Sequence, residues 1–359
     1  MAVFGAINKP KSYYDTKLYT GTGSSLNNTG LAFQPDLVWI KKRTTDSHAL
    51  TDSVRGVNKT LFTNNNNAED STTNMMTAFN SDGFTVGTNS MVNANGGTYV
   101  SWNWKAGTTS GIATNGSTTI TPTTYSINTT SGFSVLSYGG NGNNGDKLAH
   151  GLGAAPQFFI VKRYDSAANW QVYHQATGAT KYQELDTTDA FATGTDRWYD
   201  TAPDDVNITL GGSSLVNTGA GTYLVYAFKT VPGFSAFGRY NGNGTSHGAK
   251  VHTGFRPAFV MIRYSGGSNG WDWIIYNNKS GEDASNGFAY NSLGQILEAN
   301  TTDGDNANSN FTMNFLSNGF RCRGTESNIN DDNTNYVYAA FAENPFVANS
   351  GSGIPALAV

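Results

Sequence analysis

One short pattern recurs three times in this chain, and it constrains the fold more than any other feature. Each copy has a Tyr with a Gly two and four positions after it, and the copies begin at Tyr19, Tyr138 and Tyr240. Between 16 and 18 residues later, a Pro opens an apolar run that ends in a cation six residues past the Pro. These runs begin at Pro35, Pro156 and Pro257. Self-similarity in a fixed order is the signature of a repeated architecture.

The strand patterns within each copy predict an all-β fold. Each copy closes with an aromatic segment, at residues 97–104, 221–228 and 335–341. In the first of these, Val100, Trp102 and Trp104 alternate at period 2, which predicts an outer strand with one buried side. The Pro-led runs are apolar on both faces, as in central strands that are covered on both sides. No window keeps an apolar helical period for three turns.

The spacing of the copies predicts three domains rather than the short units of a solenoid. The Tyr residues are 119 and 102 residues apart in a chain of 359 residues, which suits domains of roughly 100 to 200 residues. We therefore expect three tandem β-sandwich, jelly-roll-like domains. The expected division is a tether at 1–12, sandwiches at 13–107, 131–232 and 233–346, a linker or edge strand at 108–130, and a flexible tail at 347–359.

Composition excludes several classes of partner. The net charge is −4 and the longest basic cluster is Lys41-Lys42-Arg43, so duplex nucleic acid is not an expected partner. The single Cys322 excludes an intrachain disulfide. The chain has no stretch of 18 apolar residues and no signal-peptide pattern, so we expect synthesis in a cytoplasm without membrane insertion.

Catalytic patterns are weak, and we predict that the protein is not an enzyme and needs no cofactor. There is no Gly-x-Ser-x-Gly elbow. The neighbouring acids Asp204 and Asp205 would point to opposite faces of a strand, which argues against a paired-acid site. The loop at 303–308 begins like a calcium loop but lacks the Gly at its sixth position. We predict no metal site, although a calcium ion at this loop stays an open alternative.

Four aromatic residues in Asn- and Gly-rich segments are candidates for ligand binding: Trp198, Tyr199, Trp271 and Trp273. Aromatic rings stack on the apolar face of a pyranose while nearby amides bind its hydroxyls. The alternative is that these rings cap the ends of the sandwiches.

Several stretches of the first copy resemble a repeat found in tail-fibre and other virion proteins of marine bacteriophages. They are residues 30–41, 52–56, 81–87 and 97–107, and the resemblance extends more loosely to the second and third copies. It implies a structural virion protein built of β-sandwich modules, commonly in homo-oligomers, of which we favour a trimer.

The leading hypothesis is therefore a virion component, a tail-fibre or receptor-binding protein that presents loops to a host surface glycan or protein. Avidity in an oligomer would strengthen weak single sites. The alternative is a head-decoration or tail-scaffold protein that binds other virion subunits. A depolymerase of surface polysaccharide ranks third, because the paired acids it needs are not evident.

Overall fold

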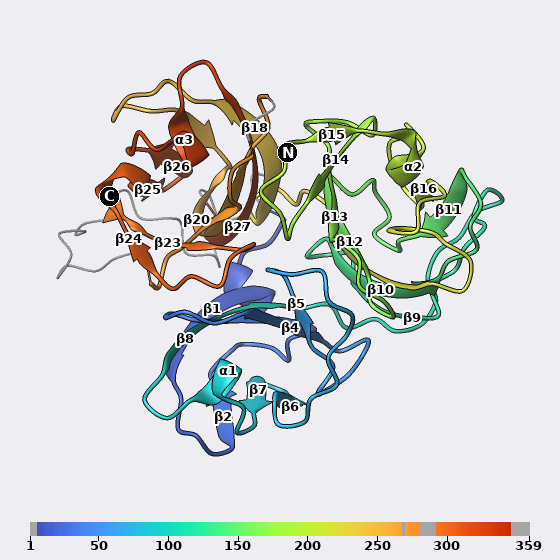
Figure 1. Cartoon of the computed structure of the whole chain (residues 1–359), viewed down its shortest axis with the longest axis horizontal. Coiled ribbons are helices and arrows are strands. Elements are labelled where there is room, and N and C mark those ends of the chain that lie inside the picture. The colour runs from blue at the N-terminus through green and yellow to red at the C-terminus, as the bar shows by residue number, and fades with distance from the viewer. Residues whose placement is uncertain (1–5, 268–269, 281–291, 346–359) are drawn as a thin grey trace.

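The computed structural model describes residues 6–267, 270–280 and 292–345, and these residues form an all-β fold of antiparallel sheets. The strands group into three lobes around a common centre (Figure 1). We define lobe 1 as residues 14–104, lobe 2 as 124–228 and lobe 3 as 235–345. Each lobe has a principal sheet and a smaller second sheet, as expected for a sandwich.

The principal sheets share one strand order. In lobe 1 it is β1-β8-β3-β4-β5, formed by Tyr14–Thr20, Thr98–Trp104, Leu37–Lys42, His48–Asp52 and Leu61–Phe62. Lobe 2 repeats it as β10-β17-β12-β13-β14, formed by Phe133–Gly139, Thr222–Phe228, Phe158–Arg163, Gln171–His174 and Lys181–Glu184. Lobe 3 repeats it as β18-β27-β20-β21-β23, formed by Ser235–Asn241, Asn335–Pro345, Phe255–Tyr264, Ile274–Asn277 and Gln295–Glu298.

Edge strands extend two of these sheets. Lobe 2 adds β9 (Thr124–Asn128) beside β10 and β15 (Ala192–Thr193) beside β14, and lobe 3 adds β24 (Asn306–Ala307) beside β23. Strand β9 lies within residues 108–130, the segment for which a linker and an edge strand were the alternatives.

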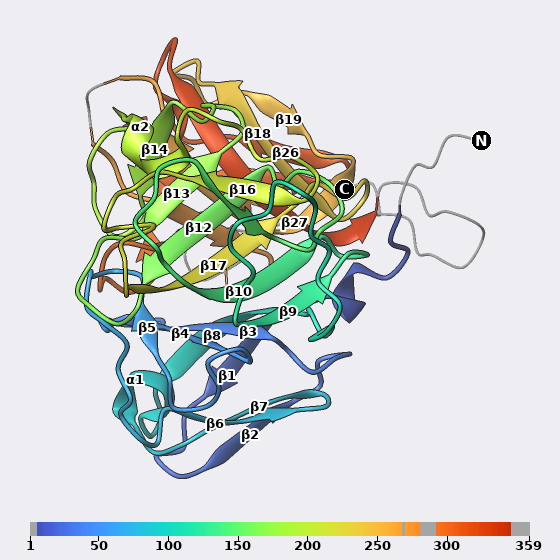
Figure 2. The same ribbon diagram turned by 90° about the vertical axis from the view of Figure 1, so that its right-hand side faces the viewer.

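The second sheets and the helices α1, α2 and α3 lie on the outer side of the lobes (Figure 1), and Figure 2 shows the second sheet of lobe 1 at the lower edge of the molecule. Lobe 1 has β2-β7-β6 (Leu26–Thr29, Gly83–Val86, Met76–Asn80) and lobe 2 has β11-β16 (Asp146–Ala149, Asn207–Leu210). Lobe 3 has β19-β26-β25-β22 (Lys250–His252, Gly319–Cys322, Met313–Leu316, Ser292–Leu293). The short helices are α1 (Ser90–Asn93), α2 (Thr195–Trp198), α3 (Ser327–Asn330), η1 (Pro10–Ser12) and η3 (Ser309–Phe311).

The prediction that the closing segments are outer strands is wrong. They form β8, β17 and β27, and each of these lies between two other strands of its sheet. Trp102 and Ser101 point to opposite faces of β8, yet both are fully buried. One face meets the lobe's own second sheet and the other faces the centre of the molecule. The Pro-led runs form the interior strands β3, β12 and β20, in agreement with their two apolar faces.

Each part of the repeated Tyr-Gly-Gly pattern has a structural role. Tyr19 stacks on Tyr99 with ring centroids 5.0 Å apart, and the other two copies stack in the same way at 5.1 Å. A Cβ on Gly21 would lie 2.3 Å from the carbonyl oxygen of Ala94, so no side chain fits there. Gly23 has a φ of 71°, which favours glycine.

Three equivalent aromatic residues meet where the lobes join. Trp104, Phe228 and Phe341 occupy the same place near the ends of β8, β17 and β27. Their ring centroids are 6.3, 5.5 and 5.4 Å apart for the three pairs, within the range of favourable aromatic contacts. All three belong to one hydrophobic core that contains residues of every lobe. The lobes therefore share a core that separately folded tandem domains would not have.

The cations that end the Pro-led runs join each lobe to its neighbour. Lys162 of lobe 2 donates from Nζ to the Asn66 carbonyl of lobe 1 at 3.0 Å. Equivalent bonds run from Lys41 Nζ to Thr302 of lobe 3 at 3.2 Å and from Arg263 Nη2 to Asp189 of lobe 2 at 2.5 Å. The three side chains are buried, and burial lowers the pKa of Lys41 and of Lys162 to about 8. The bonds run in one direction around the three lobes and close a ring.

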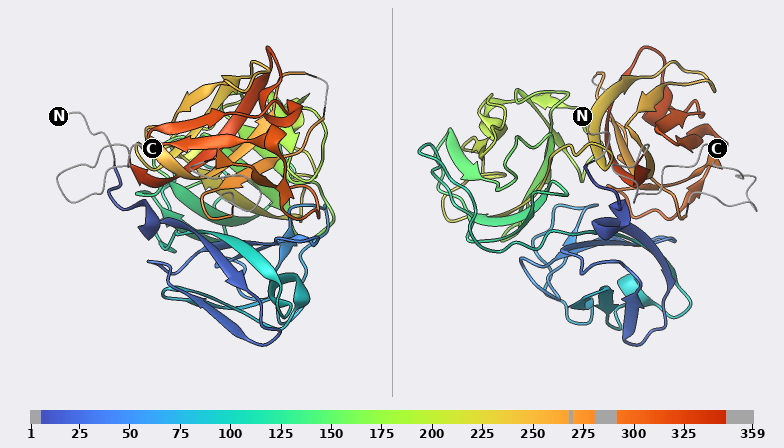
Figure 3. Two further views of the ribbon diagram at one scale, coloured as in Figure 1. Left: turned by 90° about the vertical axis from the view of Figure 1, so that its left-hand side faces the viewer. Right: turned by 180° about the vertical axis from the view of Figure 1, so that it is seen from behind.

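A second set of contacts follows the same direction. The indole Nε1 of Trp170 donates to the Phe62 carbonyl of lobe 1 at 3.0 Å, and Trp273 donates to the Glu184 carbonyl of lobe 2 at 3.0 Å. His48 takes the equivalent place in lobe 1 and faces the carbonyl of Glu298 in lobe 3. Seen from behind, the described start of the chain, in dark blue, lies at the junction of the lobes (Figure 3).

An amide or carboxyl side chain supports each of these positions. Asn64, Asp186 and Asn300 accept hydrogen bonds through Oδ1 from the backbone amides of His48, Trp170 and Trp273, each at 2.9 Å. Only lobe 2 has an acid at this position. Burial raises the pKa of Asp186 to about 6, so the negative charge that this half-buried carboxyl carries at neutral pH destabilises the folded protein.

The shared core predicts that a chain shortened to two lobes does not fold stably. Deletion of residues 233–359 removes Phe341 and leaves Trp104 and Phe228 without their partner. We expect the product to bind a hydrophobic dye and to lack near-ultraviolet circular dichroism. The full chain should unfold in a single calorimetric transition. Three separate transitions, or a natively packed two-lobe product, would contradict a shared core.

The repeated support positions predict that Asp186→Asn stabilises the protein at neutral pH. The substitution keeps the acceptor for Trp170 and removes the buried charge, as lobes 1 and 3 already do. Because the folded pKa lies above the ordinary value near 3.8, the folded state loses stability as pH rises from about 4 to about 6. We expect a gain of about 1 to 2 kcal/mol at pH 7, allowing for partial exposure.

Urea unfolding of both proteins at pH 7 and pH 4 measures this gain. It should be present at pH 7 and nearly vanish at pH 4, where the wild-type carboxyl is already neutral in the folded protein. An equal gain at both pH values would show that the charge of Asp186 is not its source.

Candidate functional site

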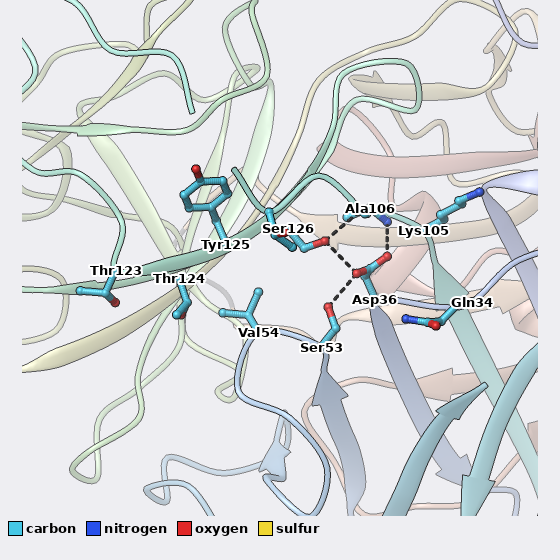
Figure 4. A pocket seen from close by; sticks show the side chains of 12 residues that line it. Gln34, Asp36, Ser53, Val54, Lys105, Ala106, Thr123, Thr124, Tyr125 and Ser126 are labelled. Atoms are coloured by element: carbon cyan, nitrogen blue, oxygen red, sulfur yellow. Dashed lines mark hydrogen bonds between the residues drawn. The ribbon is translucent and has the colours of Figure 1, made fainter. Parts of the chain in front are cut away.

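A cleft of about 450 Å³ lies between lobe 1 and strand β9 of lobe 2 (Figure 4). Lobe 1 contributes Gln34, Ser53 and Val54 to its walls, and β9 contributes Thr124 and Tyr125. The volume is within the range of small-molecule sites, and the lining combines hydroxyl groups, an amide and an aromatic residue. Such a surface can bind a polar, hydroxyl-bearing ligand.

The carboxylate of Asp36 holds the two walls together. It accepts hydrogen bonds from Ser53 Oγ at 2.7 Å, from Ser126 Oγ of β9 at 2.8 Å and from the Ala106 amide at 2.7 Å. Figure 4 shows these three bonds converging on the acid. Asp36 is only 5% exposed and both of its oxygens are engaged. Asp36 therefore links lobe 1 to β9 in a fixed arrangement.

A second buried network makes the lobe 1 wall rigid. Asp52 is fully buried and pairs with Arg55 at 2.6 Å, and Arg55 also pairs with Glu69 at 3.1 Å. From lobe 2, the Tyr226 hydroxyl donates to Asp52 at 2.9 Å. Burial raises the pKa of Tyr226, so its hydroxyl keeps the proton that it donates. The network fixes the turn that carries Ser53 and Val54.

Two of the four residues predicted to bind a ligand lie inside the protein. Trp198 is 1% exposed, with its ring 4.8 Å from that of Phe159 in the core of lobe 2. Trp273 is also 1% exposed and belongs to the shared core. Neither residue therefore offers an exposed ring to a ligand, and the prediction is wrong for Trp198 and Trp273.

The other two predicted residues lie nearer the surface, and in different lobes. Trp271 is partly buried and packs against the shared core. Tyr199, at the end of α2, is 49% exposed. The structure thus does not bring the four aromatic residues together, and Tyr199 is the one whose side chain is substantially open to solvent.

Three reactive side chains, those of His150, His174 and Cys322, are buried and have structural partners. His150 and His174 each contact a backbone carbonyl through Nε2 at 3.1 Å, from Asp204 and Tyr338 respectively. Burial raises the pKa of the Cys322 thiol to about 12, which makes it a poor nucleophile at neutral pH. The geometry offers these groups no substrate-facing position.

No metal centre is evident within residues 6–267, 270–280 and 292–345, where no three His, Cys, Asp or Glu side chains gather as ligands. In the loop considered for calcium, Asp305 pairs with Arg43 of lobe 1 at 2.5 Å. That carboxylate contributes to the contact between lobes 1 and 3. No helix in the described part of the chain is long and apolar enough to cross a membrane.

The sequence reasoning missed the cleft between the lobes. One signal was present, because the residue after the repeated Pro is Asp36 in the first copy but Gln157 and Ala258 in the others. An acid at only one of three equivalent positions indicates that this position has a role in the first copy that it lacks in the other two. Its partner Ser126 lies 90 residues away in the chain, and no pattern in the sequence relates the two.

Comparison with known proteins adds a family but no activity. No curated protein and no solved structure matches the chain. One protein-family model matches residues 9–345, a span that takes in all three lobes as a single unit. The chain therefore belongs to the family described as a domain of unknown function, DUF7483.

Proposed function

We propose that this protein is a structural component of a bacteriophage particle, in its tail-fibre or receptor-binding apparatus, where a rigid ring of lobes presents recognition surfaces to the host. The resemblance of the first copy to repeats of phage virion proteins supports this proposal. The matching stretches include β3 and β8, which are interior strands of lobe 1. The residues that resemble the phage repeats thus belong to the structural framework of lobe 1, which favours a structural role like that of the phage proteins.

One observation carries the proposal: the buried charged groups at the lobe junctions stabilise the architecture. Lys41, Lys162 and Arg263 bind carbonyls of neighbouring lobes, while Asp36 and Asp52 are held by donors from two lobes. Enzymes instead place perturbed acids, bases and nucleophiles where a substrate can reach them. A scaffold for recognition needs the rigidity that these contacts provide.

The expected homo-oligomer, with a trimer favoured, stays a prediction. The large apolar side chains exposed in the described residues are Leu18, Val57 and Tyr199, which are scattered over lobes 1 and 2. Permanent oligomers usually bury extensive apolar patches. Contacts with further copies or with other virion proteins would therefore be mainly polar.

Localisation on intact particles tests the proposal most directly. We expect cryo-electron microscopy to place the three-lobed density on the tail, and purified protein to compete with phage for adsorption to host cells. A position in the head lattice would instead favour the head-decoration alternative. Release of reducing sugar from host polysaccharide by the purified protein would overturn the non-enzymatic assignment and favour a depolymerase.

A further inference from the structure

Lobe 2 departs from the threefold pattern in its second sheet. In lobes 1 and 3 the middle strands β7 and β26 are paired on both sides. In lobe 2 the equivalent strand β16 pairs only with β11, and the short helix α2 packs where the further strand would lie. Features common to the three lobes serve the scaffold, so a feature present in one lobe is a candidate for a function of its own.

The segment that replaces the strand is firmly anchored. Trp198 is buried in the core of lobe 2, and Arg197 beside it is 7% exposed. Arg197 donates from Nε to Gln171 Oε1 at 2.7 Å and from Nη1 to Ser213 Oγ at 2.9 Å. Its guanidinium also lies 4.4 Å from the centre of the Tyr182 ring. Arg197 and Trp198 therefore hold the next residue of the chain, Tyr199, on a rigid support.

That residue is Tyr199, and its backbone is held in a disfavoured conformation. Tyr199 has a φ of 49° and Asp200 a φ of 48°, in the left-handed region that residues with side chains seldom adopt. The amide of Tyr199 donates to the Thr195 carbonyl at 2.9 Å. At 49% exposure, its side chain is the most open of the exposed large apolar residues described. Tyr199 thus ends α2 as its left-handed cap, and this conformation fixes the direction of an exposed aromatic ring.

Polar residues flank the glycine that the ring covers. A Cβ on Gly145 would lie 3.1 Å from the Tyr199 ring, so the ring rests against this glycine. The neighbours of Gly145 are the exposed Asn144 and the half-buried Asp146. Asn144 accepts from the Gly212 amide through Oδ1 at 2.6 Å, which holds its NH2 group in place. Asp146 accepts through one carboxylate oxygen from the side-chain amides of Asn141 and Asn143, which leaves its other oxygen for a ligand.

We propose that Tyr199, Asn144 and Asp146 form a binding site for a pyranose unit of a surface polysaccharide. The ring supplies a stacking surface for the C–H face of the sugar, and the amide and carboxylate bind its hydroxyl groups. This inference rests on the proposed function, because it names the ligand class of the recognition surface.

Saturation-transfer nuclear magnetic resonance with the full chain tests this site. The probes are the methyl α-pyranosides of glucose, galactose and mannose, and N-acetylglucosamine. We expect saturation transfer to the ring protons of at least one probe. Tyr199→Ala should weaken the binding of that probe at least tenfold, whereas Tyr199→Phe should retain it because the stacking face is preserved.

Val57→Ala is the matched control, since Val57 is 39% exposed in lobe 1 and should not affect binding. The inference is overturned if none of the four sugars receives saturation, or if Tyr199→Ala binds as the wild type does. Circular dichroism of each variant excludes unfolding as the cause of a loss. Sugar binding by a protein located in the head would leave this site intact while refuting the proposed function.

Discussion

The architecture depends on a cation from each lobe that reaches backbone carbonyls of the next. Moving an ammonium group out of water is unfavourable, and this is why burial lowers the pKa of Lys41 and Lys162. Carbonyl dipoles offset the loss of hydration only when they are fixed in position. The loops that provide them are fixed because a neighbouring lobe packs against them. Each lobe thus completes the environment that the next lobe's cation requires.

The sequence was sufficient to predict the repeated elements but not their assembly. The repeated pattern correctly indicated an all-β fold and interior strands led by Pro. It misplaced the closing strands because a period-2 pattern shows only that one face is buried. The apolar face of β8 packs against the other lobes, and its second face, which carries Tyr99, is also buried, against the second sheet of its own lobe. Trp198 and Trp273 were misread for a related reason. Their Asn- and Gly-rich surroundings suggest loops, but each indole packs into a core that the local sequence does not reveal.

Comparison among the three lobes separates the residues that build the common scaffold from the features that occur in one lobe alone. Positions such as Asn64, Asp186 and Asn300 keep one hydrogen bond in every lobe, so their chemistry is explained by the fold. Asp36 and the α2 segment have no counterpart in the other lobes. The cleft beside β9 and the surface around Tyr199 both lie at such departures. An internal repeat therefore provides three versions of one scaffold within a single sequence.

The ring also determines how the molecule would respond to mechanical load. Peptide bonds connect lobe 1 to lobe 2 and lobe 2 to lobe 3, whereas lobes 3 and 1 meet through non-covalent contacts in the described part of the chain. That seam contains the Lys41 contact with Thr302 and the ion pair between Arg43 and Asp305. A pull that separates β1 from β27 would act on this seam first, with the two covalent junctions as hinges. The ring of lobes would then open at this seam, while the sheet of each lobe stayed intact.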